Sequence, residues 1–340
     1  MKTRQRIAPG ALHQLNDYLG EAGNVVIIPH INADGDAVGS ALGLMLYFRR
    51  KGFSADVISP NDYPEFLHWL PGSDHVISFY RKRKKATALF LKADLVICVD
   101  FNEIARSGDM EELLKNSPVK KVLIDHHPDT VNFADLQIVD TSAAATAELV
   151  FELIVALNDK DLIDKEIAIC LATGIITDTG SFCHSAGNSR MYRIFAELLD
   201  FGVDKELIHS LVYDNFTEDR MRLMGFALCN RMVVMKEYNA AYIWLKMEDL
   251  ERFDFRMGDT EGLVNLPLSI AGINLSALFM ERKDHVKISF RSRSEFEVNR
   301  FAAKWFNGGG HNMAAGGQDD LPVEKALERF EMLVRNHGSH

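Results

Sequence analysis

The sequence lacks the features of a secreted, membrane-spanning or disulfide-stabilised protein. It has four cysteines in 340 residues, scattered without a C-x-x-C pair, which favours buried free thiols over disulfides or a zinc site. No run approaches the roughly 18 uncharged apolar residues of a membrane span. The first residues lead into no apolar stretch of the signal type. We therefore expect a cytoplasmic protein with no membrane partner.

Positive charge is also in deficit. The chain carries 38 Lys and Arg against 48 Asp and Glu, a formal net charge of −10, which would repel a phosphate backbone. This excludes a clamp for long duplexes that relies on counterion release. The basic run Arg81–Lys85 could guide RNA, although such a run is more often a solvated helix start or loop. Any nucleic-acid substrate should be short and held locally.

The chain has room for about two domains. Over the first 190 residues, apolar β-rich runs alternate with helical patterns, which is typical of a largely parallel sheet covered by helices. We therefore predict an α/β domain over residues 1–190. Its strands are expected at Val25–Pro29, Ala55–Ser59, Asp94–Val99 and Val122–Ile124, and a helix is expected at Lys165–Asp178.

The rest of the chain predicts a helical connector and a second domain. Residues 191–235 are expected to be helical, and residues 236–340 to form a smaller α/β domain. In this domain a glycine-rich loop follows the last strand and precedes a final helix. The expected elements are strands at Ala240–Leu245, Leu275–Glu281 and Val286–Arg291 and a helix at Val323–Arg335.

Acidic and imidazole side chains recur where predicted strands end. His30 follows the first strand, and Asp34-Gly35-Asp36 follows it before a helix rich in small residues. A turn in which an aspartate caps that helix would explain this segment alone. However, Asp100 also ends a predicted strand. Because open α/β sheets bind ligands at this edge, a shared site is the better explanation.

Two further segments complete the pattern. Asp125-His126-His127 follows the strand Val122–Ile124, and Asp178 closes the predicted helix Lys165–Asp178. A pair of histidines beside a turn could be a core feature, and Asp178 alone could cap the next turn. An aspartate before the histidine pair, at the end of an apolar strand, favours a functional site.

These segments resemble the four motifs of the DHH phosphoesterase superfamily, and Gly308-Gly309-Gly310-His311 resembles the GGGH motif of its DHHA1 subfamily. The resemblance covers roughly residues 20 to 317. It implies that Asp100 bridges two metal ions, that His127 contacts the scissile phosphate, and that Asp125 is an orienting residue behind the metal ligands. Arg106 is then placed near the metal centre. The implied metal ligands are His30, Asp34, Asp36, Asp100, His126 and Asp178.

The charges of this ligand set indicate two divalent cations. Four clustered aspartates carry about −4, and they could not all stay ionised without about +4 of compensation. The donors are mostly carboxylates with two imidazoles, so Mn²⁺ fits best, with Mg²⁺ and Co²⁺ as alternatives. A pair of such ions activates a water and neutralises charge in the transition state, so no protein nucleophile is needed.

The second domain is expected to select the substrate, with the active site in the cleft between the two domains. The glycines Gly308, Gly309 and Gly310 would expose backbone amides, with His311 beside them, to a phosphate or terminal nucleotide, although a plain flexible loop is the alternative. Arg282 and Arg291 are the preferred phosphate-binding arginines, and solvated surface arginines are the alternative. In the first domain, Asn32 is a further candidate for substrate binding.

Within the superfamily the chain resembles the stand-alone bacterial oligoribonucleases, relatives of RecJ, that also remove the 3′-phosphate of pAp (3′-phosphoadenosine 5′-phosphate). The resemblance implies hydrolysis of very short RNA (nanoRNA), and it allows for a homodimer. Hydrolysis of the linear dinucleotide pApA and single-strand DNA exonuclease activity are alternatives. A regulatory nucleotide-binding protein is the alternative outside the enzymes. One departure from the family is Ala143-Ala144-Ala145-Thr146, where Ser-Ser-Thr is usual.

Overall fold

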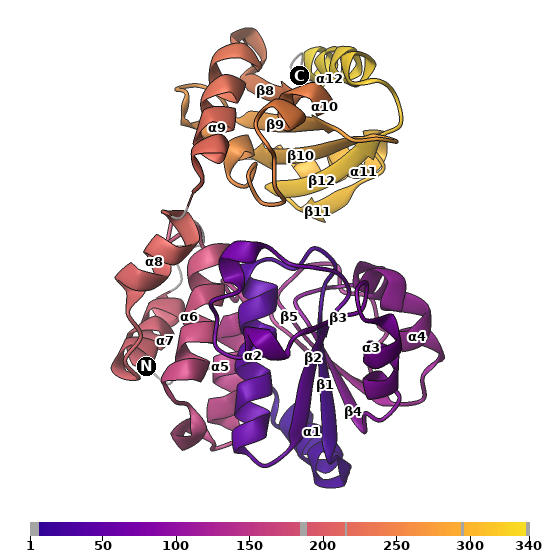
Figure 1. The fold of residues 1–340 in the computed structure, drawn as a ribbon, viewed down its shortest axis with the longest axis vertical. Coiled ribbons are helices and arrows are strands. Elements are labelled where there is room, and N and C mark those ends of the chain that lie inside the picture. Colours follow the sequence, from indigo (N-terminus) through magenta and orange to yellow (C-terminus); the bar gives the residue numbers. More distant parts are fainter. Residues whose placement is uncertain (1–6, 184–188, 215, 294–295, 338–340) are drawn as a thin grey trace. The chain divides into compact units, whose positions relative to one another are not determined.

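A computed structural model describes residues 7–183, 189–214, 216–293 and 296–337. The chain divides into two units, residues 1–215 and residues 216–340. Figure 1 shows that each unit is built around its own β-sheet with helices on both faces. The helical stretch from residue 191 contributes two helices to the first unit and one to the second.

The first sheet is parallel throughout and has the strand order β3-β2-β1-β4-β5-β6. Its central strands are runs of Val, Ile and Leu buried on both faces, as expected where helices cover a parallel sheet. All the carboxyl ends therefore meet at one edge. The strands are β1 (Asn24–Pro29), β2 (Ser54–Ser59), β3 (Ile77–Ser78), β4 (Leu95–Val99), β5 (Lys120–Asp125) and β6 (Leu136–Val139).

Two layers of helices cover this sheet (Figure 1). One apolar core includes side chains of α1 (Pro9–Glu21), α2 (Gly35–Arg50), α5 (Thr146–Ala156), α6 (Lys165–Asp178), α7 (Ser189–Asp200) and α8 (Lys205–Tyr213). The core on the opposite face includes side chains of α3 (Arg83–Phe90) and α4 (Glu111–Asn116). Short 3-10 turns complete the unit: η1 (Glu65–Leu67), η2 (Ser73–His75), η3 (Ile104–Met110) and η4 (Lys160–Leu162).

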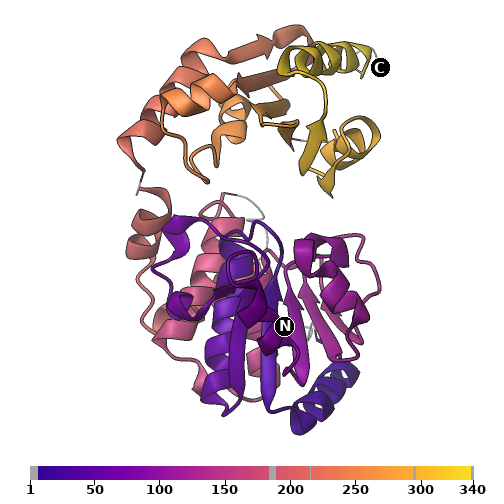
Figure 2. The ribbon, with the colours of Figure 1, turned by 45° about the vertical axis from the view of Figure 1, so that its right-hand side comes forward.

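The second sheet has the order β11-β12-β10-β9-β8-β7 and is antiparallel except between β8 and β9. Its strands are β7 (Met232–Met235), β8 (Ala240–Leu245), β9 (Leu275–Glu281), β10 (Val286–Ser292), β11 (Gly309–His311) and β12 (Ala314–Asp319). Helices α11 (Val298–Trp305) and α12 (Val323–His337) pack on one face. The other face carries α9 (Glu218–Asn230), α10 (Met247–Arg252) and η6 (Leu263–Ser269), and η5 (Lys236–Tyr238) joins β7 to β8. Figure 2 shows this unit, in orange to yellow, from a second side.

Two parts of the second unit differ from the sequence-based expectations. Met232–Met235, predicted within the helical connector, form strand β7 because they pair with β8. The segment predicted as a glycine-rich loop is instead strand β11, which pairs with β12 through Gly309 and Gly316. Among the described residues, no helix is both long and apolar enough to cross a membrane.

Candidate metal centre and substrate residues

The predicted metal ligands gather at the carboxyl edge of the first sheet. His30 directly follows β1, Asp100 follows β4, and His126 follows β5, so these three side chains come from neighbouring strands. Strand β2 lies on one side of β1 and β4 lies on the other, so the strand order reverses between β1 and β4. This is the switch point where open α/β sheets bind ligands. Asp100 adopts a φ of 66°, a left-handed conformation that Asp and Asn tolerate best.

Close packing of α2 on α6 brings two more carboxylates to this edge. A Cβ on Gly35 would lie 2.4 Å from the side chain of Thr177, and one on Gly39 would lie 2.4 Å from the backbone oxygen of Cys170. Only glycine permits this approach. As a result Asp36, in the first turn of α2, lies beside Asp178, at the end of α6.

The six side chains form two groups of donor atoms that meet at Asp100. In one, Nε2 of His30 lies 3.6 Å from Oδ2 of Asp100 and 3.9 Å from Oδ1 of Asp34. In the other, Nε2 of His126 lies 3.5 Å from Oδ1 of Asp100 and 3.6 Å from Oδ2 of Asp178, and Asp36 completes the group. Each oxygen of Asp100 thus faces a different group.

These spacings suit metal coordination. Two donors bound to one ion at about 2.1 Å lie about 3.0–3.4 Å apart, slightly closer than the atoms found here. Nδ1 of His30 lies 2.8 Å from the backbone oxygen of Ile31, and Nδ1 of His126 lies 3.3 Å from that of Ala143. When Nδ1 donates to a carbonyl, Nε2 is left to bind a metal. The donor chemistry therefore fits a pair of divalent cations.

Buried hydrogen bonds hold the carboxylates in place. Asp36 is fully buried and accepts from the backbone amides of Thr146 (2.6 Å) and Ala147 (2.9 Å) and from the hydroxyl of Ser40 (3.2 Å). The Thr146 hydroxyl donates to Oδ1 of Asp100 at 2.9 Å. Thr146 thus provides a hydroxyl contact beside the three alanines that replace part of the family pattern. Asp34 also caps α2, accepting from two backbone amides, so capping and a metal role are compatible.

His127 is oriented by a buried acid and an arginine. Its Nδ1 lies 2.7 Å from Oδ1 of Asp125, which is fully buried, and its Nε2 lies 3.1 Å from a guanidinium nitrogen of Arg106. Because an arginine only donates, Nε2 accepts in this arrangement and Nδ1 donates to Asp125. Arg106 lies in η3, and its backbone oxygen accepts from the amide of Ile31. Three predicted residues therefore meet beside the two donor groups.

Comparison with known proteins shows the family to which the chain belongs. A family model described as DHH family, N-terminal domain, matches residues 24–175, and a DHHA1 domain model matches residues 237–336. The chain is 31% identical to a bifunctional oligoribonuclease and PAP phosphatase, NrnA, from Thermus thermophilus, covering 92% of this chain and 90% of that protein. This decides the family. The chain belongs to the DHH family.

Solved structures agree with this assignment. The crystal structure of an exopolyphosphatase-related protein from Bacteroides fragilis has a TM-score of 0.94 and 39% identity, over 98% of this DHH chain and 97% of that one. RecJ from Thermus thermophilus, solved with Mn²⁺, has a TM-score of 0.57 and 15% identity, over 100% of this chain and 55% of RecJ. The RecJ match shows a shared fold only.

Charge crowding in the DHH domain shifts several pKa values. Burial raises the pKa of Asp178 to about 7, assisted by Asp100 and opposed by His126. Burial lowers the pKa of His126, but Asp178 and Asp100 outweigh it and raise the value to about 9. Burial also raises the pKa of Asp36 well above its ordinary value. For Asp100, burial is outweighed by three histidines, which hold its pKa below the usual range.

These pKa shifts predict that bound metal stabilises the protein more at high pH than at low pH. Asp178 and His126 both have raised pKa values in the folded state, so the folded protein holds protons that the unfolded chain releases. The protons on these two side chains contribute stability that is fully present at low pH. This contribution is lost as the pH rises through about 7 for Asp178 and about 9 for His126. Bound cations displace those protons. We expect the Tm of metal-free protein to fall between pH 6 and 8.5.

Differential scanning calorimetry with and without saturating Mn²⁺ at both pH values checks this. A ligand at about 100 times its Kd adds about 2.7 kcal/mol of stability, which corresponds to several degrees. The increment in Tm should be larger at pH 8.5 than at pH 6. An increment that is equal at the two pH values, or smaller at pH 8.5, would contradict the assignment of these side chains as ligands.

In the DHHA1 domain, the candidate arginines are half-buried on the second sheet. Arg291 on β10 points away from the core face formed by its neighbours, and burial lowers its pKa. Arg282 follows β9 and lies over the ring of Phe255, 5.2 Å from its centroid. Lys287, which was not predicted from the sequence, shares the face of Arg291. Burial and the charge of Arg282 lower the pKa of Lys287.

Two glycines of the GGGH motif, Gly308 and Gly310, are required by close backbone packing. A Cβ on Gly308 would lie 2.0 Å from the backbone oxygen of Gly316. Gly310 has a φ of 139°, and its Cβ would lie 2.6 Å from the oxygen of Ala314. His311 ends β11 and pairs with Ala314. The motif is thus an ordered strand edge, and not a plain flexible loop.

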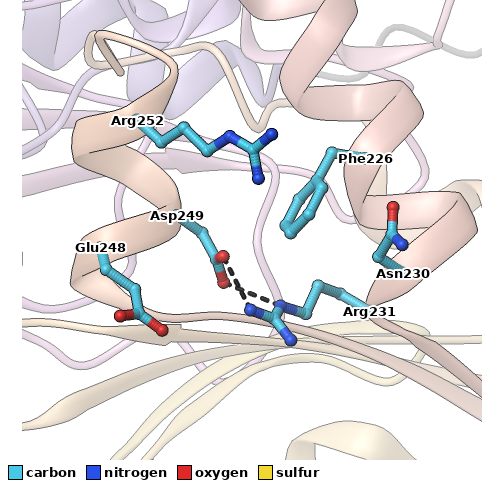
Figure 3. A pocket seen from close by; sticks show the side chains of 6 residues that line it. All are labelled: Phe226, Asn230, Arg231, Glu248, Asp249 and Arg252. Atoms are coloured by element: carbon cyan, nitrogen blue, oxygen red, sulfur yellow. Dashed lines mark hydrogen bonds and ion pairs between the residues drawn. The ribbon is translucent and has the colours of Figure 1, made fainter.

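A hollow of about 420 Å³ in the second unit contains none of the predicted substrate residues. Figure 3 shows its lining, in which Arg231 forms two hydrogen bonds with Asp249, of 2.9 and 2.8 Å. Arg252 and Phe226 face this pair (Figure 3). Because these two opposite charges neutralise each other, the hollow is not a candidate for the chemistry of the first unit.

Proposed function

We propose that this protein is a two-metal phosphoesterase that hydrolyses short oligoribonucleotides to mononucleotides and pAp to AMP. The observation that carries the proposal is the pair of donor groups that share Asp100, one oxygen to each. The activity of the Thermus relative, which is similar over nine-tenths of both chains, supports the substrate class. The enzyme type we infer is an Mn²⁺-dependent phosphodiesterase and phosphatase.

Each side chain has a distinct task in this proposal. His30, Asp34 and Asp100 would hold one cation, and Asp36, His126, Asp178 and Asp100 would hold the other. The cations, when bound, supply an activated water and charge neutralisation at the phosphate. His127, fixed by Asp125, contacts the scissile phosphate, and Arg106 donates to a phosphate oxygen. Water would add to phosphorus as the bond to the leaving oxygen breaks, and the proton that the water loses would pass to that oxygen.

The second domain is proposed to bind the terminal nucleotide. Arg291 and Arg282 carry charges that burial already destabilises, so an added phosphate would be held strongly. The Gly308–His311 edge would offer backbone amides, and Asn32 would contact substrate from the first domain.

Purified protein incubated with Mn²⁺ tests the function. The substrates are a 5′-labelled pentaribonucleotide and pAp, and the products to be measured are mononucleotides and free phosphate. We expect turnover of both. Inactivity on both substrates with metal bound would refute the proposal and favour a regulatory nucleotide-binding protein. If pApA or a single-stranded DNA pentamer is turned over faster than the RNA, the faster compound becomes the assigned substrate.

Arg291→Ala provides a test of substrate binding. Losing a hydrogen bond to a charged group costs about 1.5–3 kcal/mol, so KM should rise at least about tenfold. The kcat should change little, because this contact would hold substrate and transition state equally. The control is Arg300→Ala, which removes an exposed ion pair with Glu297 and should leave KM unchanged. An unchanged KM for the Arg291 variant would remove Arg291 from the site.

A further inference from the structure

The basic run singled out in the sequence lies at the same sheet edge as the metal centre. Strand β3 ends at Ser78, and α3 begins at Arg83, so residues 79–82 cross the carboxyl edge of the first sheet. Tyr80 is 74% exposed, the highest value among the exposed large hydrophobic side chains of the described residues. The five residues from Arg81 to Lys85 are all exposed.

One set of contacts joins this segment to the residues after β1. Arg81 donates to a carboxylate oxygen of Asp62 at 2.6 Å. The neighbour of Asp62, Asn61, makes two hydrogen bonds of 2.8 Å with Asn32, one to its backbone and one to its side chain. Asn32 belongs to the motif that starts with His30. Tyr80 is therefore fixed relative to the first donor group through a short series of polar contacts.

A second set of contacts joins the segment to η3. Arg83 lies over the ring of Phe79, 4.9 Å from its centroid, and 3.8 Å from a carboxylate oxygen of Asp109. Asp109 is in η3, the same turn that presents Arg106 to His127. Two of the basic residues, Arg81 and Arg83, thus anchor the segment from two sides.

The remaining basic residues are available to a ligand. Lys82, Lys84 and Lys85 are exposed and have no ion pair among the described parts of the chain. An exposed aromatic ring beside several cations is the arrangement with which proteins bind single-stranded nucleic acid, by base stacking and backbone attraction. In a chain of net charge −10, such a local basic surface can attract a phosphate backbone.

We propose that Tyr80 and these three lysines bind the nucleotides of an oligoribonucleotide that lie beyond the one being cleaved. This inference rests on the proposed function, and it names the residues that favour RNA over pAp. Strand β3 lies two strands from β1 in the sheet, a distance of about 10 Å at the usual strand spacing. The nucleotide next to the cleaved bond can span this distance. pAp carries one nucleoside, so it has no second base to place on Tyr80.

The test compares kcat/KM on a pentaribonucleotide and on pAp, using the full chain with Mn²⁺. The variants are Tyr80→Ala and Lys82→Glu/Lys84→Glu. The conservative control is Tyr80→Phe, which keeps the stacking ring. The charge-matched control is Lys92→Glu/Lys165→Glu. Both of these lysines are exposed, one after the end of α3 and the other at the start of α6, about 20 Å along that helix from Asp178.

We expect each test variant to lose at least about tenfold on the pentamer, the size of one lost base stack. Activity on pAp should stay within about twofold, and both controls should match wild type. A plot of log KM for the pentamer against log salt concentration should also be less steep in the lysine variant. Its slope should be smaller by about 1.4, for two lost phosphate contacts. Equal losses on both substrates, or no loss on the pentamer, would overturn the proposal.

Direct binding separates this proposal from the proposed function. Fluorescence anisotropy with a labelled pentaribonucleotide, in Ca²⁺ instead of Mn²⁺, measures affinity without requiring turnover. If wild type hydrolyses neither substrate, the phosphoesterase proposal fails. The binding surface is then still supported by a Kd that rises at least about tenfold in Tyr80→Ala. It is overturned by a Kd that does not change.

Discussion

Replacing Asp100 by Asn is expected to reduce kcat/KM by at least about 10³-fold. Asp100 directs one carboxylate oxygen to each donor group, so loss of its charge weakens both proposed cation sites together. Charge stabilisation by such ions is worth several kcal/mol in the transition state, and each 1.36 kcal/mol is about tenfold in rate. Steady-state kinetics at saturating Mn²⁺ on the pentaribonucleotide measures the effect.

The choice of Asn follows from the backbone. Asp100 has a φ of 66°, which Asn tolerates far better than Ala, and an amide oxygen can still accept from the hydroxyl of Thr146. The matched control is Asp94→Asn, at the opposite end of β4, where the carboxylate accepts only from groups around Asn24. Wild-type rates in Asp100→Asn would show that Asp100 is not a ligand.

His127→Ala is expected to lower kcat by about 10²–10³-fold, the usual cost of removing one group that stabilises charge in a transition state. Metal binding should survive, because Nδ1 of His127 is engaged by Asp125 and its Nε2 by Arg106. Titration calorimetry with Mn²⁺ separates the two effects. This variant should therefore lose rate at full metal occupancy.

The control for this variant is His13→Ala, an exposed histidine on α1 whose side chain is 82% exposed. Unchanged kcat in His127→Ala, or loss of one of the two cations, would mean that His127 serves another role. Loss of a cation would make it a metal ligand.

The sequence predicted the elements whose own residues decide their structure. Strands β4 and β5 are apolar runs buried on both faces, and the bounds of α6 agree with its helical spacing. Strand β3 has two residues and β6 has four, too short for an alternation pattern to be distinguished from a loop. Strand β11 depends on its partner, since Gly309–His311 has no β-forming side chain. Strand β7 has only four residues and forms by pairing with β8.

The candidate site was accessible from sequence because its side chains follow strand ends, and parallel strands end at one edge. The contacts between distant segments could not be predicted from the sequence. The Thr146 hydroxyl reaches Asp100 across 46 positions, and Asn61 binds Asn32 across 29. Arg106 was expected near the metal centre, but its contact with His127 depends on the fold of η3.

One carboxylate, Asp100, is proposed to join the two cation sites. Crystals soaked in Mn²⁺ and measured at the manganese absorption edge give the positions of bound ions directly. We expect two anomalous peaks about 3.5–4 Å apart, the separation of known two-metal centres, with one oxygen of Asp100 at each. A single peak, or peaks away from Asp100, would contradict the account.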